Sequence, residues 1–245
     1  VTRGEHIARA IGTCTLCHAE DLGGTVYADM GPVGLVAGPN LTRGRGGIGA
    51  SLTDRDWVRA IRHGVRRDGT SLIVMPSEVF TFLNDSDLAA LIAFLKQLPP
   101  VDRDVPRSRF GPVGRALLAT GRMNILVAPK THEVERPVIT PAPTAEYGRY
   151  LASVSGCHGC HGFGLSGGRV AGPSNLPPAS NITTAGIGQW SQEDFRRLMR
   201  TGVRPGGGRI NEFMPWRTLG RMTDDELHAL WLYLRQAPPR PFGQK

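Results

Sequence analysis

All four cysteines of this 245-residue chain lie in two short motifs, and each motif ends in a histidine. The motifs are Cys14-Thr15-Leu16-Cys17-His18 and Cys157-His158-Gly159-Cys160-His161. Two thiols three positions apart can bond to two carbons along one edge of a planar ring, and the imidazole that follows can bind a metal ion at the centre of that ring. The spacing C-x-x-C-H therefore predicts covalent heme attachment at two places.

Three other uses of paired cysteines fit the sequence less well. Zinc ribbons separate their two pairs by about 15–20 residues, whereas about 140 residues separate the pairs here. A redox-active C-x-x-C pair expects a strand before it and a helix after it, but glycine-rich segments follow both motifs. Structural disulfides give no reason for a histidine after each pair.

The chain also repeats itself at offsets of about 140 residues, which indicates two copies of one fold. The repeated landmarks are Asn40-Leu41-Thr42 with Asn181-Ile182-Thr183, Gly47-Ile48-Gly49 with Gly186-Ile187-Gly188, residues 52–69 with 190–207, Met75-Pro76 with Met214-Pro215, and residues 87–100 with 226–239. Because the landmarks keep their order, each copy is expected to place them in the same parts of its fold.

Each copy predicts the same helices around its heme motif. Helices are expected over about 3–12 and 146–155, before the motifs. Further helices are expected to begin at Thr53 and Ser191, each followed three residues later by an aspartate that completes a capping box. The final helices, capped by Asn84 and Thr223, carry apolar stripes at i, i+3, i+4 and i+7, which are Leu88, Leu91, Ile92 and Leu95 in the first copy and Leu227, Leu230, Trp231 and Leu234 in the second. No segment predicts a strand with comparable strength.

The order helix, CxxCH, loop, helix, methionine loop, helix resembles class I cytochromes c, and the whole chain resembles tandem diheme cytochromes c. The resemblance covers both repeats, about 100 residues each. It implies an all-α fold with two tandem class I cytochrome c domains and loop-rich heme pockets. The expected divisions are domain 1 at 1–100, a Pro-rich linker at 101–144 interrupted by a helix over 114–122, and domain 2 at 145–245. Each domain would hold one covalently bound heme c.

The resemblance also implies the iron ligands. The fifth ligands are His18 and His161, and the sixth are methionines of the loop before the last helix, Met75 and Met214, which lie 57 and 53 residues further on. The cofactor-binding residues are thus Cys14, Cys17, His18, Met75, Cys157, Cys160, His161 and Met214.

Alternative ligands have weaker support. Met30 is close to His18 in sequence, and His63 has Thr201 as its counterpart in the second copy. Met199 and Met222 are on or beside expected helices, where a methionine is ordinarily part of the core packing or of the surface. The resemblance to class I cytochromes c also implies that a proline carbonyl supports each proximal histidine, with Pro39 and Pro173 as the candidates.

Charge and hydropathy limit the kinds of partner that the chain can have. Residues 1–100 are neutral, residues 101–144 carry net +3 and residues 145–245 carry net +5. The arginines are not interleaved with aromatics as in nucleic-acid-binding segments, so an ordinary solvated arginine-rich surface is the better expectation. Such a surface can also steer an acidic partner. The longest apolar run is too short to span a bilayer. The first residue is Val, and we expect any signal peptide or anchor to lie outside this sequence.

Two irons closed by His and Met leave no position for a small-molecule substrate, so the resemblance implies single-electron transfer between redox proteins rather than an enzyme. The chain would act as a carrier or as the electron-transfer subunit of a membrane-associated respiratory, photosynthetic or dehydrogenase complex, and it is similar to cytochrome subunits of membrane-bound dehydrogenases. The alternative is a diheme enzyme such as a peroxidase with one open heme. Heme attachment to CxxCH implies a periplasmic or other extracytoplasmic location, either free or held at the membrane by an anchor.

Overall fold

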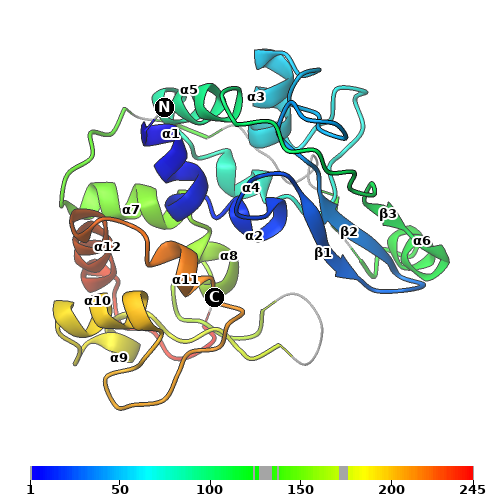
Figure 1. Cartoon of the computed structure of the whole chain (residues 1–245). Coiled ribbons are helices and arrows are strands. Elements are labelled where there is room, and N and C mark those ends of the chain that lie inside the picture. The colour runs from blue at the N-terminus through cyan, green and yellow to red at the C-terminus, as the bar shows by residue number, and fades with distance from the viewer. Residues whose placement is uncertain (1, 124, 127–133, 137, 171–175, 245) are drawn as a thin grey trace. The chain divides into compact units, whose positions relative to one another are not determined.

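The structure is a computed structural model, and it describes residues 2–123, 125–126, 134–136, 138–170 and 176–244 (Figure 1). The chain divides into two compact units. Unit 1 comprises residues 1–9 and 14–136, and unit 2 comprises residues 10–13 and 137–245. Within the described part of the chain, no helix is long and apolar enough to cross a membrane.

The elements up to residue 136 are mostly short helices. They are α1 (Thr2–His6), a π-helical turn η1 (Ile7–Ile11), α2 (Thr15–His18), β1 (Thr25–Asp29), β2 (Gly34–Gly38), α3 (Asp54–His63), α4 (Ser77–Phe80), α5 (Asp85–Leu95), β3 (Arg109–Phe110) and α6 (Pro112–Ala119). The helix predicted over 114–122 is α6, which begins two residues earlier because Pro112 occupies its first turn.

The elements after residue 137 are helices. They are α7 (Ala145–Val154), α8 (Cys157–His161), α9 (Thr184–Ile187), α10 (Gln192–Thr201), α11 (Trp216–Leu219) and α12 (Asp224–Gln236). The N-terminal helix predicted over 146–155 is α7. The order of helices around the second CxxCH motif is therefore the predicted one.

The predicted helix starts are confirmed at the level of side-chain hydrogen bonds. Thr53 and Ser191 each form a capping box with the aspartate three residues on. Asn84 caps α5, and Thr223 caps α12 with a further capping box. All eight apolar stripe residues of α5 and α12 are buried, with 7% exposure or less. These stripes form the core of each unit.

Each unit is built on a close crossing of its first and last long helices. In Figure 1, α1 lies beside α5 and α7 lies beside α12. Glycine makes both crossings possible: a Cβ on Gly4 would lie 2.0 Å from the Ala90 carbonyl oxygen, and one on Gly148 would lie 1.9 Å from that of Ala229. Such distances leave no room for a side chain, so the two helix backbones are in direct contact.

A three-stranded antiparallel sheet in unit 1 departs from the all-α expectation. The strand order is β1-β2-β3, with Thr25 opposite Gly38 and Gly34 opposite Phe110. The strands have only two to five residues and β2 contains glycines, so the alternation of apolar and polar residues that predicts a strand is not recognisable in the sequence. The unit is otherwise helical.

Much of the segment predicted as a linker belongs to unit 1. Residues 101–136 cluster with it, and β3 pairs with β2. The Asn40 amide donates to the Val101 carbonyl at 2.7 Å, and the Ser108 hydroxyl donates to the Ala37 carbonyl at 2.9 Å. This part of the chain is therefore packed against the fold.

Candidate heme sites

Both CxxCH motifs form a single helical turn. Cys14 is the N-cap of α2, which contains Cys17 and His18, and α8 spans Cys157–His161. All four cysteines are free thiols. Burial raises the pKa of Cys14 and Cys157 to about 12, so both are neutral at pH 7. One helical turn places the two thiols and the imidazole of each motif close together, as attachment to one porphyrin edge requires.

The histidine of each motif is fixed by a backbone carbonyl. The Nδ1 atom of His18 lies 2.9 Å from the Pro39 carbonyl oxygen, and that of His161 lies 2.7 Å from the Ser180 oxygen. A carbonyl only accepts, so Nδ1 carries the proton and Nε2 keeps its lone pair for a metal. Burial, the larger effect, lowers the pKa of both imidazoles and keeps them neutral.

These contacts confirm Pro39 and correct the prediction of Pro173. Pro173 lies outside the described residues, and the acceptor for His161 is Ser180. The repeat could have shown this, because Pro39 precedes Asn40 as Ser180 precedes Asn181. The support is a backbone carbonyl, so its position relative to the asparagine matters and the side chain does not.

The repeated Asn-x-Thr motif holds that carbonyl in place. In unit 1 the Thr42 backbone N–H and hydroxyl donate to Asn40 Oδ1 at 2.9 and 2.7 Å. Thr183 makes the same bonds to Asn181 at the same distances. The Asn181 amide also donates to the Arg240 carbonyl at 2.8 Å. Each asparagine thus ties its histidine-supporting loop to a distant part of its unit.

The two methionine loops are attached by different chemistry. Met75 is half-buried in the segment of chain that leads from α3 to α4, and the nearby Ser77 hydroxyl donates to the Ala60 carbonyl of α3 at 2.9 Å. In unit 2 the counterpart of Ser77 is Trp216, which packs with Met214. The indole is so close to Gly202 that a Cβ there would lie 2.7 Å from it.

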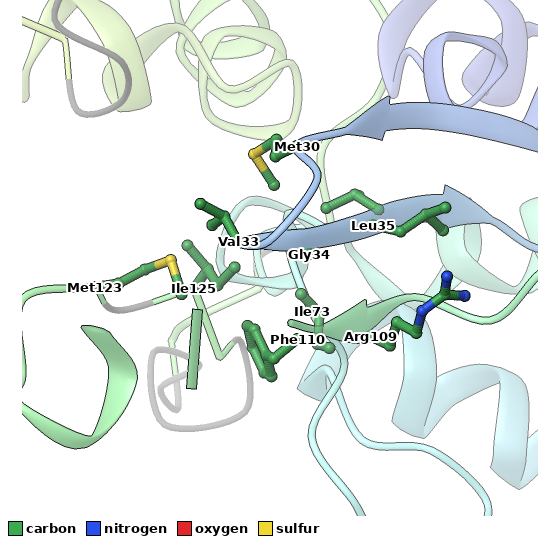
Figure 2. Close-up of a pocket in the computed structure, with 10 residues that line it drawn as sticks. Met30, Val33, Gly34, Leu35, Ile73, Arg109, Phe110, Met123 and Ile125 are labelled. Carbon is green, nitrogen blue, oxygen red and sulfur yellow. The ribbon is translucent and has the colours of Figure 1, made fainter. Parts of the chain in front are cut away.

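The other methionines lie in the core or line a pocket. Met199 and Met222 are core residues, 3% and 0% exposed, so of the two expected locations, core or surface, the structure shows the core. Met30 and Met123 line an apolar pocket beside β2 and β3, which Figure 2 shows together with Ile73. Met123 has no counterpart in the second repeat, so the internal repetition does not single it out.

The residues present fit covalently bound heme c. Each unit offers two free thiols and an imidazole with Nε2 available, and each has a methionine on its predicted loop. The buried indole N–H groups of Trp57 and Trp216 have no acceptor among the described residues. A group that brings buried acceptors, such as the heme propionates, suits these donors. Among the described residues, no cluster of three or more His, Cys, Asp or Glu side chains suggests a different metal site.

Comparison with known proteins agrees with this donor set. The family described as "Cytochrome c" matches residues 145–238, and the family described as "Cytochrome C oxidase, cbb3-type, subunit III" matches residues 1–95. The alcohol dehydrogenase (quinone) cytochrome c subunit of Gluconacetobacter polyoxogenes is 31% identical over the whole chain, which spans 57% of that relative.

Two further relatives are similar. The gluconate 2-dehydrogenase cytochrome c subunit of Pantoea cypripedii is 31% identical over the whole chain and 61% of the relative. A diheme cytochrome c-type protein of Cereibacter sphaeroides is 29% identical over 97% of the chain and 86% of its own length. The chain thus spans a little more than half of the dehydrogenase subunits that it matches. With a cytochrome family matched in each half of the sequence, the chain belongs to the cytochromes c.

Proposed function

We propose that this chain is a diheme c-type cytochrome that passes single electrons between redox proteins. We assign one covalent heme c to each repeat, residues 1–100 and 145–245, which residues 101–144 connect; the part of this connection up to residue 136 clusters with unit 1. The observation that carries the proposal is the duplicated arrangement of a CxxCH turn, an imidazole fixed at Nδ1 and an Asn-anchored carbonyl. An arrangement that occurs twice, with the same bonds, serves the same chemistry twice.

In each repeat the cysteines attach the heme and the histidine binds its iron. Cys14 and Cys17 bond to the first ring and Cys157 and Cys160 to the second, while His18 and His161 present Nε2 to the iron. Heme supplies reversible one-electron chemistry when bound, and the protein sets its potential and orientation.

The methionines close the remaining coordination position of each iron. Met75 and Met214 come from loops fixed to α3 and α10, and a thioether ligand favours a high potential. Since both faces of each iron are occupied, no small-molecule substrate binds there. The chain is therefore an electron-transfer protein and not a catalytic subunit.

The relatives favour a place in a dehydrogenase system. Cytochrome c subunits of alcohol and gluconate dehydrogenases align with the whole chain. We assign this chain the same kind of role, as a carrier or subunit that receives electrons from a dehydrogenase and hands them to a respiratory complex. Because heme is attached to CxxCH outside the cytoplasm, the location is periplasmic or extracytoplasmic.

Heme counting in paired variants tests the proposal. The protein is made in a host with heme-attachment machinery, and its covalent heme is counted by intact mass. Two hemes are expected in the unaltered chain and one in each of Cys14→Ser/Cys17→Ser and Cys157→Ser/Cys160→Ser. A single heme in the unaltered chain, or carbon monoxide binding to its reduced form, would contradict the closed diheme carrier and favour an open heme of the peroxidase kind.

A further inference from the structure

The most exposed aromatic side chain in the described part of the protein lies just after the second CxxCH motif. Phe163 follows His161 by two residues and is 85% exposed. Its ring stacks on His158 with centroids 5.5 Å apart and planes 15° apart. His158 in turn meets Tyr233 of α12 edge-on at 6.3 Å. Phe163 is thus held in a defined place on the surface, where a partner could bury it and gain hydrophobic free energy.

A groove lies beside this ring. One wall is the loop Phe163–Leu165, and the other is the end of α12 with the residues after it, from Tyr233 to Arg240. The groove has a volume of about 240 Å³, and Leu165, 3% exposed, lines it. We call it the Phe163 groove. Its walls expose both polar and apolar atoms, so they suit a side chain of another protein that offers both kinds of contact.

Positive charge borders the groove without an internal partner. Arg240 runs along the loop, since a Cβ on Gly164 would lie 3.1 Å from its Cδ atom and 3.4 Å from its Cζ atom. Arg149 follows Gly148 in α7, where a Cβ would lie 2.9 Å from the Tyr233 Cβ atom, so this part of α7 packs against Tyr233. Arg149 also lowers the pKa of the Tyr233 phenol, although burial, the larger effect, raises it. Within the described residues, neither guanidinium forms an ion pair or a side-chain hydrogen bond.

Several arginines of α10 and α11 differ in this respect. Four guanidinium groups of α10 and α11 are within 2.7–3.1 Å of a carboxylate, namely those of Arg196, Arg197, Arg200 and Arg217. Their charge is largely neutralised within the unit. Arg149 and Arg240 keep their charge available for a partner, so the chemistry that complements this surface is a carboxylate beside an apolar side chain.

The groove also lies at the edge where the second heme is attached. His158, which directly follows Cys157 in the second motif, stacks on Phe163 and meets Tyr233 edge-on. The other cysteine of the motif, Cys160, is exposed. A protein bound in the groove would therefore be close to the covalent edge of the ring.

We propose that the Phe163 groove, with Arg149 and Arg240 at its border, is the docking surface through which an acidic electron-transfer protein reaches the second heme. The proposal rests on the diheme carrier function above. Electrons would pass one at a time: each encounter oxidises the donor by one electron and reduces one ferric heme to ferrous.

The test uses the full heme-loaded chain and a plant-type ferredoxin, an acidic one-electron donor of low potential. Stopped-flow absorbance gives the second-order rate of heme reduction by reduced ferredoxin at low and high salt. Arg149→Glu/Arg240→Glu should lower the low-salt rate by about tenfold or more, within the range of electrostatic steering. The matched control is Arg115→Glu/Arg122→Glu, two exposed arginines of unit 1 with the same change in net charge. It should stay within about twofold of the unaltered chain.

The apolar part is tested separately. Phe163→Ala should lower the rate at high salt as well, by about tenfold, as expected for the loss of a central apolar contact. Equal losses in the two double variants would show only general attraction and would overturn the proposal. So would an unchanged rate in Phe163→Ala or in Arg149→Glu/Arg240→Glu. Reduction by dithionite distinguishes a failure of the carrier function from a failure of the docking surface. If dithionite does not reduce the hemes, the carrier function itself is refuted. If dithionite reduces both hemes but the groove variants keep the unaltered rate with ferredoxin, only the docking surface is refuted.

Discussion

Replacing Asn181 by Ala tests whether the Asn-x-Thr motif supports the second heme. The side chain accepts two hydrogen bonds from Thr183 and donates one to the Arg240 carbonyl, at 2.7–2.9 Å. These bonds hold the loop whose Ser180 carbonyl accepts from His161. Removal of the amide therefore affects both the stability of unit 2 and the proximal imidazole.

The magnitude follows from the bonds lost. Each contributes about 1 kcal/mol net, so Asn181→Ala should destabilise unit 2 by about 3 kcal/mol. For a unit of this size that lowers its melting temperature by about 15 °C. If the loop shifts and His161 loses its acceptor, the imidazole becomes a weaker donor to iron. The potential of the second heme should then rise.

Calorimetry and a redox titration of the heme-loaded variant measure both effects. Asn211→Ala is the matched control, since Asn211 is exposed and accepts one bond from the Phe213 N–H. It should change stability by no more than about 0.5 kcal/mol. If Asn181→Ala has the same melting temperature and the same two heme potentials as the unaltered chain, the role given to the Asn-x-Thr motif is refuted.

Three further changes have defined outcomes. Gly148→Ala places a Cβ 1.9 Å from the Ala229 carbonyl oxygen, so calorimetry should show unit 2 destabilised by about 2 kcal/mol or more despite the better helix propensity of alanine. Trp216→Ala removes the indole that packs with Met214, and the reduced protein should then bind carbon monoxide at one heme. Hydrogen bonds from Ser191, the backbone bond first, lower the pKa of Asp194 in the folded state. The stabilisation is therefore present above the unfolded pKa of about 3.9 and is lost as pH falls through the lower folded pKa, which denaturant melts between pH 7 and pH 2.5 should show.

Each of these has its own control. Gly206→Ala, where a Cβ meets nothing within 4 Å, should leave stability nearly unchanged, and a loss equal to that of Gly148→Ala would refute the crossing argument. Ser77→Ala removes one hydrogen bond from the other methionine loop and should not open its heme to carbon monoxide. Ser191→Ala should weaken the acid dependence, and an unaltered pH profile would count against the capping box.

The helices were predictable because their signals are local. A hydroxyl or amide side chain three residues before an acidic residue, followed by apolar residues at helical spacing, favours the start of a helix. Four such residues cap helices where expected, namely Thr53, Asn84, Ser191 and Thr223. The CxxCH turns are equally local. The internal repeat showed in addition that both halves of the chain share the same order of helices, Asn-x-Thr motif and methionine loop.

Features that depend on distant partners were missed. The strand β2 carries glycine at both ends and is completed by β3, more than 70 residues away, so its own residues gave no sign of the sheet. Ser180 was missed because its backbone, not its side chain, contacts His161. The exposure of Phe163 likewise had no sequence signal, since an apolar residue after a heme motif is ordinarily expected to be buried.

A spectroscopic redox titration of the purified protein, repeated under carbon monoxide, tests the central claim most directly. The account predicts two one-electron steps at comparatively high potentials from two low-spin hemes, and no change in the reduced spectrum when carbon monoxide is added. A heme that binds carbon monoxide, or one that titrates far below the other, would contradict the His/Met ligation by Met75 or Met214.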